Sequence, residues 1–439
     1  MDSTTMAKQF SPKRRKILLG GLAAGAAAAT WGVKPSDIGE NHSPYFVSLS
    51  QALDNKKLAK PTLVVDKKKL LQNISVLKQH INNRFDYRIV VKSLPSIELV
   101  KLVMEESASK KLMVFHQPFL SLVATEIPHS DVLMGKPMPV TAAKTFYELE
   151  KATPTSFNSE KDLQWLIDSP QRLEQYLDLA NTLQQKMNIN IELDVGFHRG
   201  GVNSDSDLLD MLHLLEKSEL LTFSGFMGYE PHIGVVPGGL FSNRDKAMDS
   251  YRRYIALTER TLGRSIQDLC LNSAGSPTYQ AYDEGDFPHN ELSAGTCLVK
   301  PTHYDIPTLS DHIPASYIAT PVLKSIDHTD IPGVDGLGDA MAMWDPNRAQ
   351  TFFTYGGYWK AEPESPKGIS LNPLYGRSTN QEMYNGSKAI SLKQDDWIFM
   401  RPTQSEFVFL QFGDIALLDE GEIKHLWPVL SETGFVQSA

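Results

Sequence analysis

The chain of 439 residues is poor in cysteine and has no excess of basic residues. Its two cysteines, Cys270 and Cys297, could form one disulfide at most, which excludes a small disulfide-stabilised scaffold. Asp and Glu number 52 against 43 Lys and Arg, a net charge of -9, which argues against a nucleic-acid partner because phosphate binding requires a basic surface. Hydrophobic residues make up 41% and charged residues 22%, as in a globular protein of roughly two or three domains.

The first 40 residues have a composition of their own. They hold six basic and three acidic residues. Arg14 and Arg15 precede an uncharged run, residues 17–31, which is rich in Ala and Gly and shorter than the ~20 residues of a membrane-spanning helix. This order resembles a bacterial twin-arginine signal, so we predict that residues 1–40 direct export to the periplasm. An uncleaved membrane anchor and a basic tail remain as alternatives.

From residue 61 onward, short β-type runs alternate with longer amphipathic stretches. A first strand is predicted at residues 62–65, and helices at 160–186 and 244–262 are examples of the stretches between strands. Eight further strands are predicted at residues 88–91, 111–115, 131–135, 155–158, 190–195, 222–228, 268–272 and 291–296. Eight such steps favour an α/β fold with a (β/α)8 barrel over residues 41–310, and an open doubly wound sheet is the alternative. Both cysteines lie at neighbouring strands of this barrel, where we expect buried free thiols.

After residue 305 the pattern changes, because Pro and Gly become frequent and long helical patterns end. Short β-type runs are predicted at residues 316–321, 351–355, 397–400, 406–412 and 415–418. Residues 311–439 are therefore predicted to form a separate, mostly-β domain.

In a barrel of this kind, functional side chains lie where the strands end. Lys92 directly follows the apolar run 88–91 and would point into the barrel mouth. A partly desolvated lysine can form a Schiff base with a carbonyl compound. The alternative is a solvated lysine that only caps the strand.

Three further strand ends carry candidate ligand-binding residues. Arg199 precedes two glycines that allow the backbone to approach a ligand closely. Tyr229 and His232 could stack on a flat cofactor. The small residues after the seventh strand, with their hydroxyls and backbone N–H groups, form a plausible phosphate cradle: Ser273, Ala274, Gly275 and Ser276. Ordinary packing, a glycine-rich turn and a helix cap are the alternatives.

Together these segments resemble the pyridoxal-phosphate enzymes of the alanine-racemase fold (fold type III), in the branch of D-threonine aldolase and D-serine dehydratase. The resemblance implies a barrel followed by a β domain, a homodimer, and pyridoxal 5'-phosphate as cofactor for a small amino acid. By position, Lys92 would carry the cofactor and move protons at the substrate's Cα. Arg199, Tyr229 and His232 would lie around the cofactor ring, and residues 273–276 would hold its phosphate.

The chain also departs from this family. Gln381 and Gln404 stand where the lyases have metal-binding histidines, and Glu406 stands where they have Cys or Asp. Because amides are poor zinc ligands, we predict no metal site of the family type. Leu94 replaces a histidine near the lysine, and Ser293 replaces an Arg or Gln beside the pyridine nitrogen.

Three functions remain open at this point. The first is a metal-independent lyase, an aldolase or a dehydratase, acting on a small D-amino acid. The second is a racemase, in which Tyr355 or Tyr358 would supply the second base opposite Lys92. The third is a pyridoxal-phosphate-binding protein without catalytic activity.

Overall fold

The computed structural model describes residues 34–431, so most of the predicted signal segment lies outside the described residues. The described chain divides into two compact units. The barrel unit comprises residues 48–320, 359–362 and 399–431, and the sheet unit comprises residues 34–47, 321–358 and 363–398.

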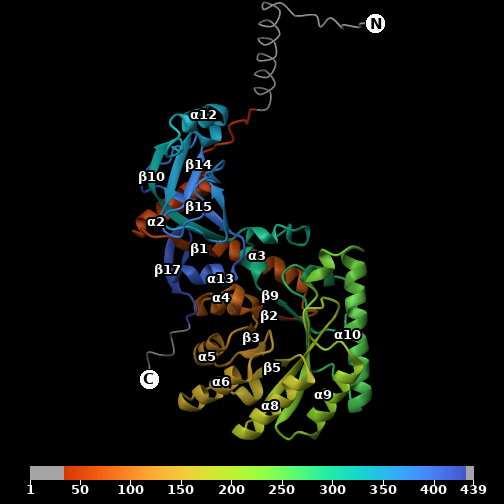
Figure 1. Cartoon of the computed structure of the whole chain (residues 1–439). Coiled ribbons are helices and arrows are strands. Elements are labelled where there is room, and N and C mark those ends of the chain that lie inside the picture. The colour runs from red at the N-terminus through yellow and green to blue at the C-terminus, as the bar shows by residue number, and fades with distance from the viewer. Residues whose placement is uncertain (1–33, 432–439) are drawn as a thin grey trace, which may run out of the picture. The chain divides into compact units, whose positions relative to one another are not determined.

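Eight parallel strands close the barrel, and helices surround them (Figure 1). The strands are β2 (Asp86–Val90), β3 (Lys111–Val114), β4 (Asp131–Met134), β5 (Leu163–Ile167), β6 (Met187–Leu193), β7 (Leu221–Gly228), β8 (Cys270–Ser273) and β9 (Glu291–Ala294). β2 pairs with both β3 and β9, which closes the circle. The predicted barrel is therefore confirmed, and an open sheet is excluded.

The helices between the strands are amphipathic. They are α3 (Lys67–Ile81), α4 (Ile97–Ser107), α5 (Gln117–Glu126), α6 (Val140–Ala152), α7 (Ser159–Asp162), α8 (Pro170–Leu183), α9 (Asp205–Lys217) and α10 (Leu240–Leu262). In α3, Leu70, Ile74 and Leu77 recur at helical spacing and are buried. Asp66 caps this helix by accepting a hydrogen bond from the backbone N–H of Lys69.

The fourth barrel strand was predicted at the wrong place. It is β5 at Leu163–Ile167, not residues 155–158, and it occupies the start of the predicted helix 160–186. Helix α8 begins only at Pro170, where the side chain of Ser169 accepts a hydrogen bond from the backbone N–H of Arg172. A proline fits the first helical turn but breaks a helix interior, so a single helix could not run through this position.

Further strands in the barrel unit pair outside the barrel. β1 (Thr62–Asp66) pairs antiparallel with the first part of β10 (Ser316–Asp327) and parallel with β16 (Asp414–Asp419). β17 (Glu422–Pro428) pairs antiparallel with β16.

The sheet unit is mostly β structure, in agreement with the predicted β-rich region after the barrel. Its strands include β11 (Gln350–Thr354), β13 (Ser370–Leu371) and β14 (Met383–Gly386), which pair with one another or with the second part of β10. Its one sizeable helix among the described residues is α12 (Leu337–Trp344). α2 (Pro44–Asn55), β12 (Ala361–Ser365) and β15 (Trp397–Pro402) each contribute residues to both units.

A second prediction was wrong at residues 406–412, which are helical rather than extended. They form α13 (Glu406–Phe409) and a 3₁₀ turn, Leu410–Phe412. The side chains of Val408, Phe409 and Phe412 are buried while that of Phe407 is exposed. Phe409 and Phe412 follow Val408 by one and four positions, which places the three side chains on one face of a helix. A strand would instead bury every second residue.

Both cysteines are free thiols, as expected: Cys270 at the start of β8 and Cys297 in the short helix α11 (Thr296–Val299). Cys297 is buried as well, whereas Cys270 is partly exposed. None of the helices within residues 34–431 has both the length and the apolar character needed to span a membrane.

Candidate active site

A pocket opens in the barrel unit where the strands end at their carboxyl side. Six of the eight predicted cofactor-binding residues line it: Lys92, Arg199, Tyr229, Ala274, Gly275 and Ser276. Other residues that line it include Ser93, Gly295, Thr296, Tyr304 and Glu406. The pocket therefore combines an amine, a guanidinium, a carboxylate and several hydroxyls.

Lys92 lies in the single 3₁₀ turn, Val91–Ser93, that directly follows β2. Its Nζ is 2.9 Å from Oε1 of Glu406 and 4.4 Å from the centre of the Phe115 ring. The side chains of Lys92 and Glu406 are 39% and 36% exposed, so both reach the open part of the pocket. The ion pair joins two segments from opposite ends of the chain, and the sequence contained no signal for it.

Arg199 lies in the loop after β6. Its guanidinium carbon is 5.1 Å from the centre of the Phe197 ring and 5.0 Å from that of Tyr229, within the range of cation–π attraction. Gly201 has a φ of +92°, and a Cβ there would lie 2.7 Å from the backbone N of Asp194. Only glycine fits this turn, because the Gly201 backbone packs against the backbone of Asp194. The close approach of this loop to a ligand stays a prediction.

Tyr229 follows β7 and forms one wall of the pocket. Burial raises the pKa of its hydroxyl, so the ring stays neutral. His232 is not among the residues that line the pocket. Its ring is stacked parallel to that of Phe197, with the ring centres 6.0 Å apart. Burial lowers the pKa of His232.

The loop after β8 is held by the fully buried carboxylate of Glu230. The hydroxyl of Ser273 donates to Glu230 at 2.8 Å, and the hydroxyl of Thr278 donates at 3.1 Å. The backbone N–H of Ala274 also donates to it, at 3.3 Å. Ser273 is thus turned away from the pocket, although it was a predicted phosphate ligand, while Ala274 to Ser276 face it.

The facing wall comes from the segment after β9. Ser276 Oγ accepts hydrogen bonds from the backbone N–H groups of Gly295 and Cys297, both at 3.1 Å. The hydroxyls of Ser93 and Thr296 are 2.8 Å apart. A Cβ on Gly295 would lie 2.7 Å from the carbonyl oxygen of Val90. The small residues that end the eighth predicted strand were a usable signal for this wall.

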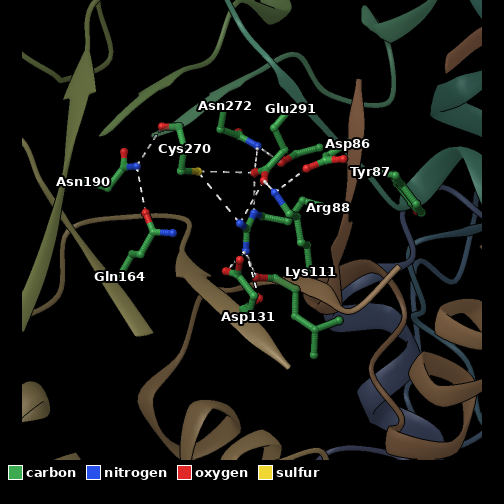
Figure 2. A network of polar contacts seen from close by, with 12 residues as sticks. Asp86, Tyr87, Arg88, Lys111, Asp131, Gln164, Asn190, Cys270, Asn272 and Glu291 are labelled. Atoms are coloured by element: carbon green, nitrogen blue, oxygen red, sulfur yellow. Dashed lines mark hydrogen bonds and ion pairs between the residues drawn. The ribbon is translucent and has the colours of Figure 1, made fainter. Parts of the chain in front are cut away.

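The floor of the pocket rests on a buried polar network inside the barrel (Figure 2). Ser293 lines the pocket, and the side-chain amide of Asn272 donates at 2.7 Å both to Ser293 Oγ and to Glu291 Oε1. Glu291 accepts in turn from Arg88 at 2.9 Å. Burial alone would raise the pKa of Glu291, but the cations Arg88 and Lys111 lower it to about 2.

Tyr355 and Tyr358 belong to the sheet unit, with exposed fractions of 44% and 60%, and are not among the residues lining the pocket. Gln381, in the same unit, bridges to Gly356 through the backbone. Across residues 34–431, no three His, Cys, Asp or Glu side chains are grouped so that they could hold a metal ion.

Comparison with known proteins agrees with this architecture. The family of the alanine racemase N-terminal domain matches residues 65–302, more than half of the chain. The chain belongs to this family. A comparison with curated protein sequences gives no match.

Solved structures of low sequence identity share the fold. D-threonine aldolase from Filomicrobium marinum has a TM-score of 0.66 at 13% identity, covering 85% of this chain and 96% of that one. D-threo-3-hydroxyaspartate dehydratase from Delftia sp. HT23 has a TM-score of 0.63 at 14% identity, covering 85% and 97%. Alanine racemase from Bacillus anthracis has a TM-score of 0.64 at 12% identity, covering 84% and 98%.

Proposed function

We propose that this protein is a pyridoxal-phosphate-dependent enzyme that acts at Cα or Cβ of a small D-amino acid, as a metal-independent lyase. The observation that carries the proposal is the position of Lys92, at a strand end in a pocket walled by small and hydroxyl-bearing residues. Membership of the alanine racemase family supports the cofactor, and the likeness to an aldolase and a dehydratase supports the reaction class.

The residues present fit the cofactor. Gly275 packs against Tyr229 so closely that a Cβ would lie 2.7 Å from its ring, so a larger residue would displace this wall of the pocket. The hydroxyls of Ser276 and Thr296 would hold the phosphate. Tyr229 and Arg199 would border the ring, and Ser293 would face the pyridine nitrogen.

When bound, pyridoxal phosphate withdraws electrons from the substrate's Cα and weakens the bonds there. The protein supplies the remaining functions. Lys92 would hold the cofactor through Nζ and, as the amine in the pocket, would take and return the proton at Cα. Arg199 would attract the substrate carboxylate, and the buried loop held by Glu230 would keep the phosphate wall rigid.

The experiment that tests this proposal is an absorbance spectrum of the purified protein after incubation with pyridoxal phosphate. We expect a visible band in the wild type that Lys92→Ala abolishes. Lys101→Ala is the matched control, because Lys101 lies on the exposed surface of α4 and pairs only locally with Glu98. A wild type that stays colourless would refute the proposal.

The products then identify the reaction. An aldolase releases an aldehyde from D-threonine, and a dehydratase releases ammonia and an oxo acid from D-serine. A protein that gives the band but converts no small D- or L-amino acid would be a binding protein without catalysis.

A racemase is the second candidate, and the likeness to the Bacillus anthracis alanine racemase favours it. In that case we propose the partner subunit's Tyr355 as the second base, a role for which Tyr358 is the alternative. Tyr355→Phe should then abolish the conversion of D-alanine to L-alanine and leave the visible band intact.

We also propose that the protein is a homodimer exported through the twin-arginine route. Light scattering of the purified protein tests the dimer. The export route is tested by replacing both Arg14 and Arg15 with lysine and locating the protein by cell fractionation. If the segment is a twin-arginine signal, the variant should no longer reach the periplasm. A membrane-bound wild type would favour the uncleaved anchor.

A further inference from the structure

Glu406 is a pocket residue that the family match does not reach, because that match ends at residue 302. It begins the short helix α13, and its carboxylate is 2.9 Å from Nζ of Lys92. It is the one carboxylate among the described residues lining the pocket. Lys92 and Arg199 supply the positive charges.

Two other acids near the pocket have their oxygens occupied by hydrogen bonds. Glu230 is fully buried and accepts from Ser273, Ala274 and Thr278. Asp194 is 5% exposed and accepts from His198 and from the backbone of Gly196. The side chain of Glu406, in contrast, is 36% exposed. Its contact with Lys92 is made by Oε1, so the carboxylate can still accept further hydrogen bonds.

The negative charge of Glu406 also affects two tyrosines that line the pocket. Burial raises the pKa of both Tyr229 and Tyr304, and the negative charge of Glu406 raises each further. The carboxylate of Glu406 therefore lies in the same pocket as Tyr229, Tyr304 and Lys92. A substrate side chain entering this space meets a hydrogen-bond acceptor with a negative charge.

The consequence for a ligand follows from elementary electrostatics. A hydroxyl can donate to a carboxylate, and such a charge-assisted hydrogen bond is stronger than a neutral one. A second carboxylate at the same place would be repelled, and like-charge contacts are a common way to reject a wrong partner.

We infer that Glu406 determines side-chain specificity: it favours a small hydroxyl-bearing amino acid and disfavours an acidic one. This inference rests on the proposed function, because it concerns the substrate of the same pocket. The carboxylate of Glu406 has acceptor sites beyond its contact with Lys92, and the substrate's hydroxyl would donate to one of them.

The test measures binding rather than turnover. Protein loaded with pyridoxal phosphate is titrated with D-serine, D-alanine and D-aspartate, and the dissociation constants are read from the change in cofactor absorbance. In the wild type we expect D-serine to bind most tightly and D-aspartate most weakly. Glu406→Gln should tighten D-aspartate binding about tenfold, equivalent to about 1.4 kcal/mol, because the repulsion is lost.

Two further variants separate charge from hydrogen bonding. Glu406→Asp keeps the charge and should keep D-aspartate the weakest ligand. Glu406→Ala removes the acceptor and should weaken D-serine about fivefold relative to D-alanine. Glu422→Gln is the control, since Glu422 is a surface acid of the same chain segment that pairs with Lys424, and it should change none of these constants.

The outcomes are distinct. If Glu406→Gln leaves the ratio of D-aspartate to D-serine binding unchanged, the inference is overturned while the proposed function stands. If the wild type gives no cofactor band at all, the proposed function fails, and the inference fails with it. Since the Glu406 side chain is partly exposed, all three variants should fold, which thermal unfolding verifies.

Discussion

The ion pair of Arg88 and Glu291 offers a sharp test of how the barrel is held together. Both side chains are fully buried inside the closed ring of strands. Arg88 also donates to the carbonyl of Leu112 and to Asp131, at 3.0 Å each (Figure 2). Lys111 contacts Glu291 at 2.9 Å. Glu291→Gln therefore leaves two cations facing a neutral amide.

The magnitude follows from the burial. Breaking a buried ion pair by removing one partner costs about 3–5 kcal/mol, because the other charge stays desolvated. Asp131 remains beside Arg88, so we expect the lower end, about 3 kcal/mol. Against the 5–15 kcal/mol that is typical for folded proteins, this is a large fraction of the free energy of unfolding.

Urea unfolding measures this cost. The control is Glu98→Gln, which breaks an exposed ion pair with Lys101 and should cost less than about 1 kcal/mol. The double variant Arg88→Met with Glu291→Leu leaves neither of these two buried charges without the other and should be more stable than Glu291→Gln. It should stay below the wild type, because Lys111, Asp131 and the Leu112 carbonyl each lose a partner. A Glu291→Gln protein as stable as the Glu98→Gln control would refute the reasoning.

Acid should weaken the same contact. Because the folded-state pKa of Glu291 is lowered to about 2 while an unfolded glutamate titrates near ~4.3, the pair stabilises the fold fully above that higher value. The stabilisation is lost as the pH falls through about 2. Wild-type stability should therefore fall more steeply in acid than that of Glu291→Gln, as measured by urea midpoints at successive pH values. Parallel curves would contradict this.

Two further predictions concern the pocket wall and the surface. Gly275→Ala should weaken pyridoxal-phosphate binding at least tenfold, because the new Cβ would press on the Tyr229 ring; equilibrium dialysis measures the loss. His80 bridges Asp283 and Asp311 at 2.6 and 2.7 Å, and although burial opposes it, these carboxylates raise its pKa. Its stabilisation is present below the unfolded value of about 6.5 and is lost as the pH rises through the folded pKa, so His80→Asn should remove a pH dependence of under about 1 kcal/mol from thermal unfolding curves.

The barrel could be predicted from the sequence because each strand is a short apolar run beside an amphipathic helix. The prediction failed where two patterns overlap. Leu163, Trp165 and Leu166 fit either a buried strand or the start of a helix, and only Pro170 marks the boundary locally. At residues 406–412, apolar residues occur at nearly every position. The sequence there fits the periodicity of a helix and that of a strand equally well.

The site was predictable as far as strand ends determine it. Lys92, Arg199 and Tyr229 each follow a strand and do line one pocket. Which hydroxyl faces that pocket is not a local property. Ser273 and Ser276 look equivalent in sequence, and the buried carboxylate of Glu230 decides between them by binding Ser273. The orientation of each serine depends on tertiary contacts, which cannot be predicted from the spacing of residues in the sequence.

The amide of Asn272 connects the stability of the barrel to the chemistry of the pocket. Its two N–H groups are divided between Glu291 inside the barrel and Ser293 on the pocket floor. If Glu291 becomes Gln, the new amide can rotate and offer Asn272 a donor instead of an acceptor, and Ser293 must change its own hydrogen bonding. Glu291→Gln should therefore shift the absorbance band of the bound cofactor as well as lower stability. The double variant Arg88→Met with Glu291→Leu should recover part of the stability but not the band, because the leucine side chain that replaces Glu291 gives Asn272 no acceptor.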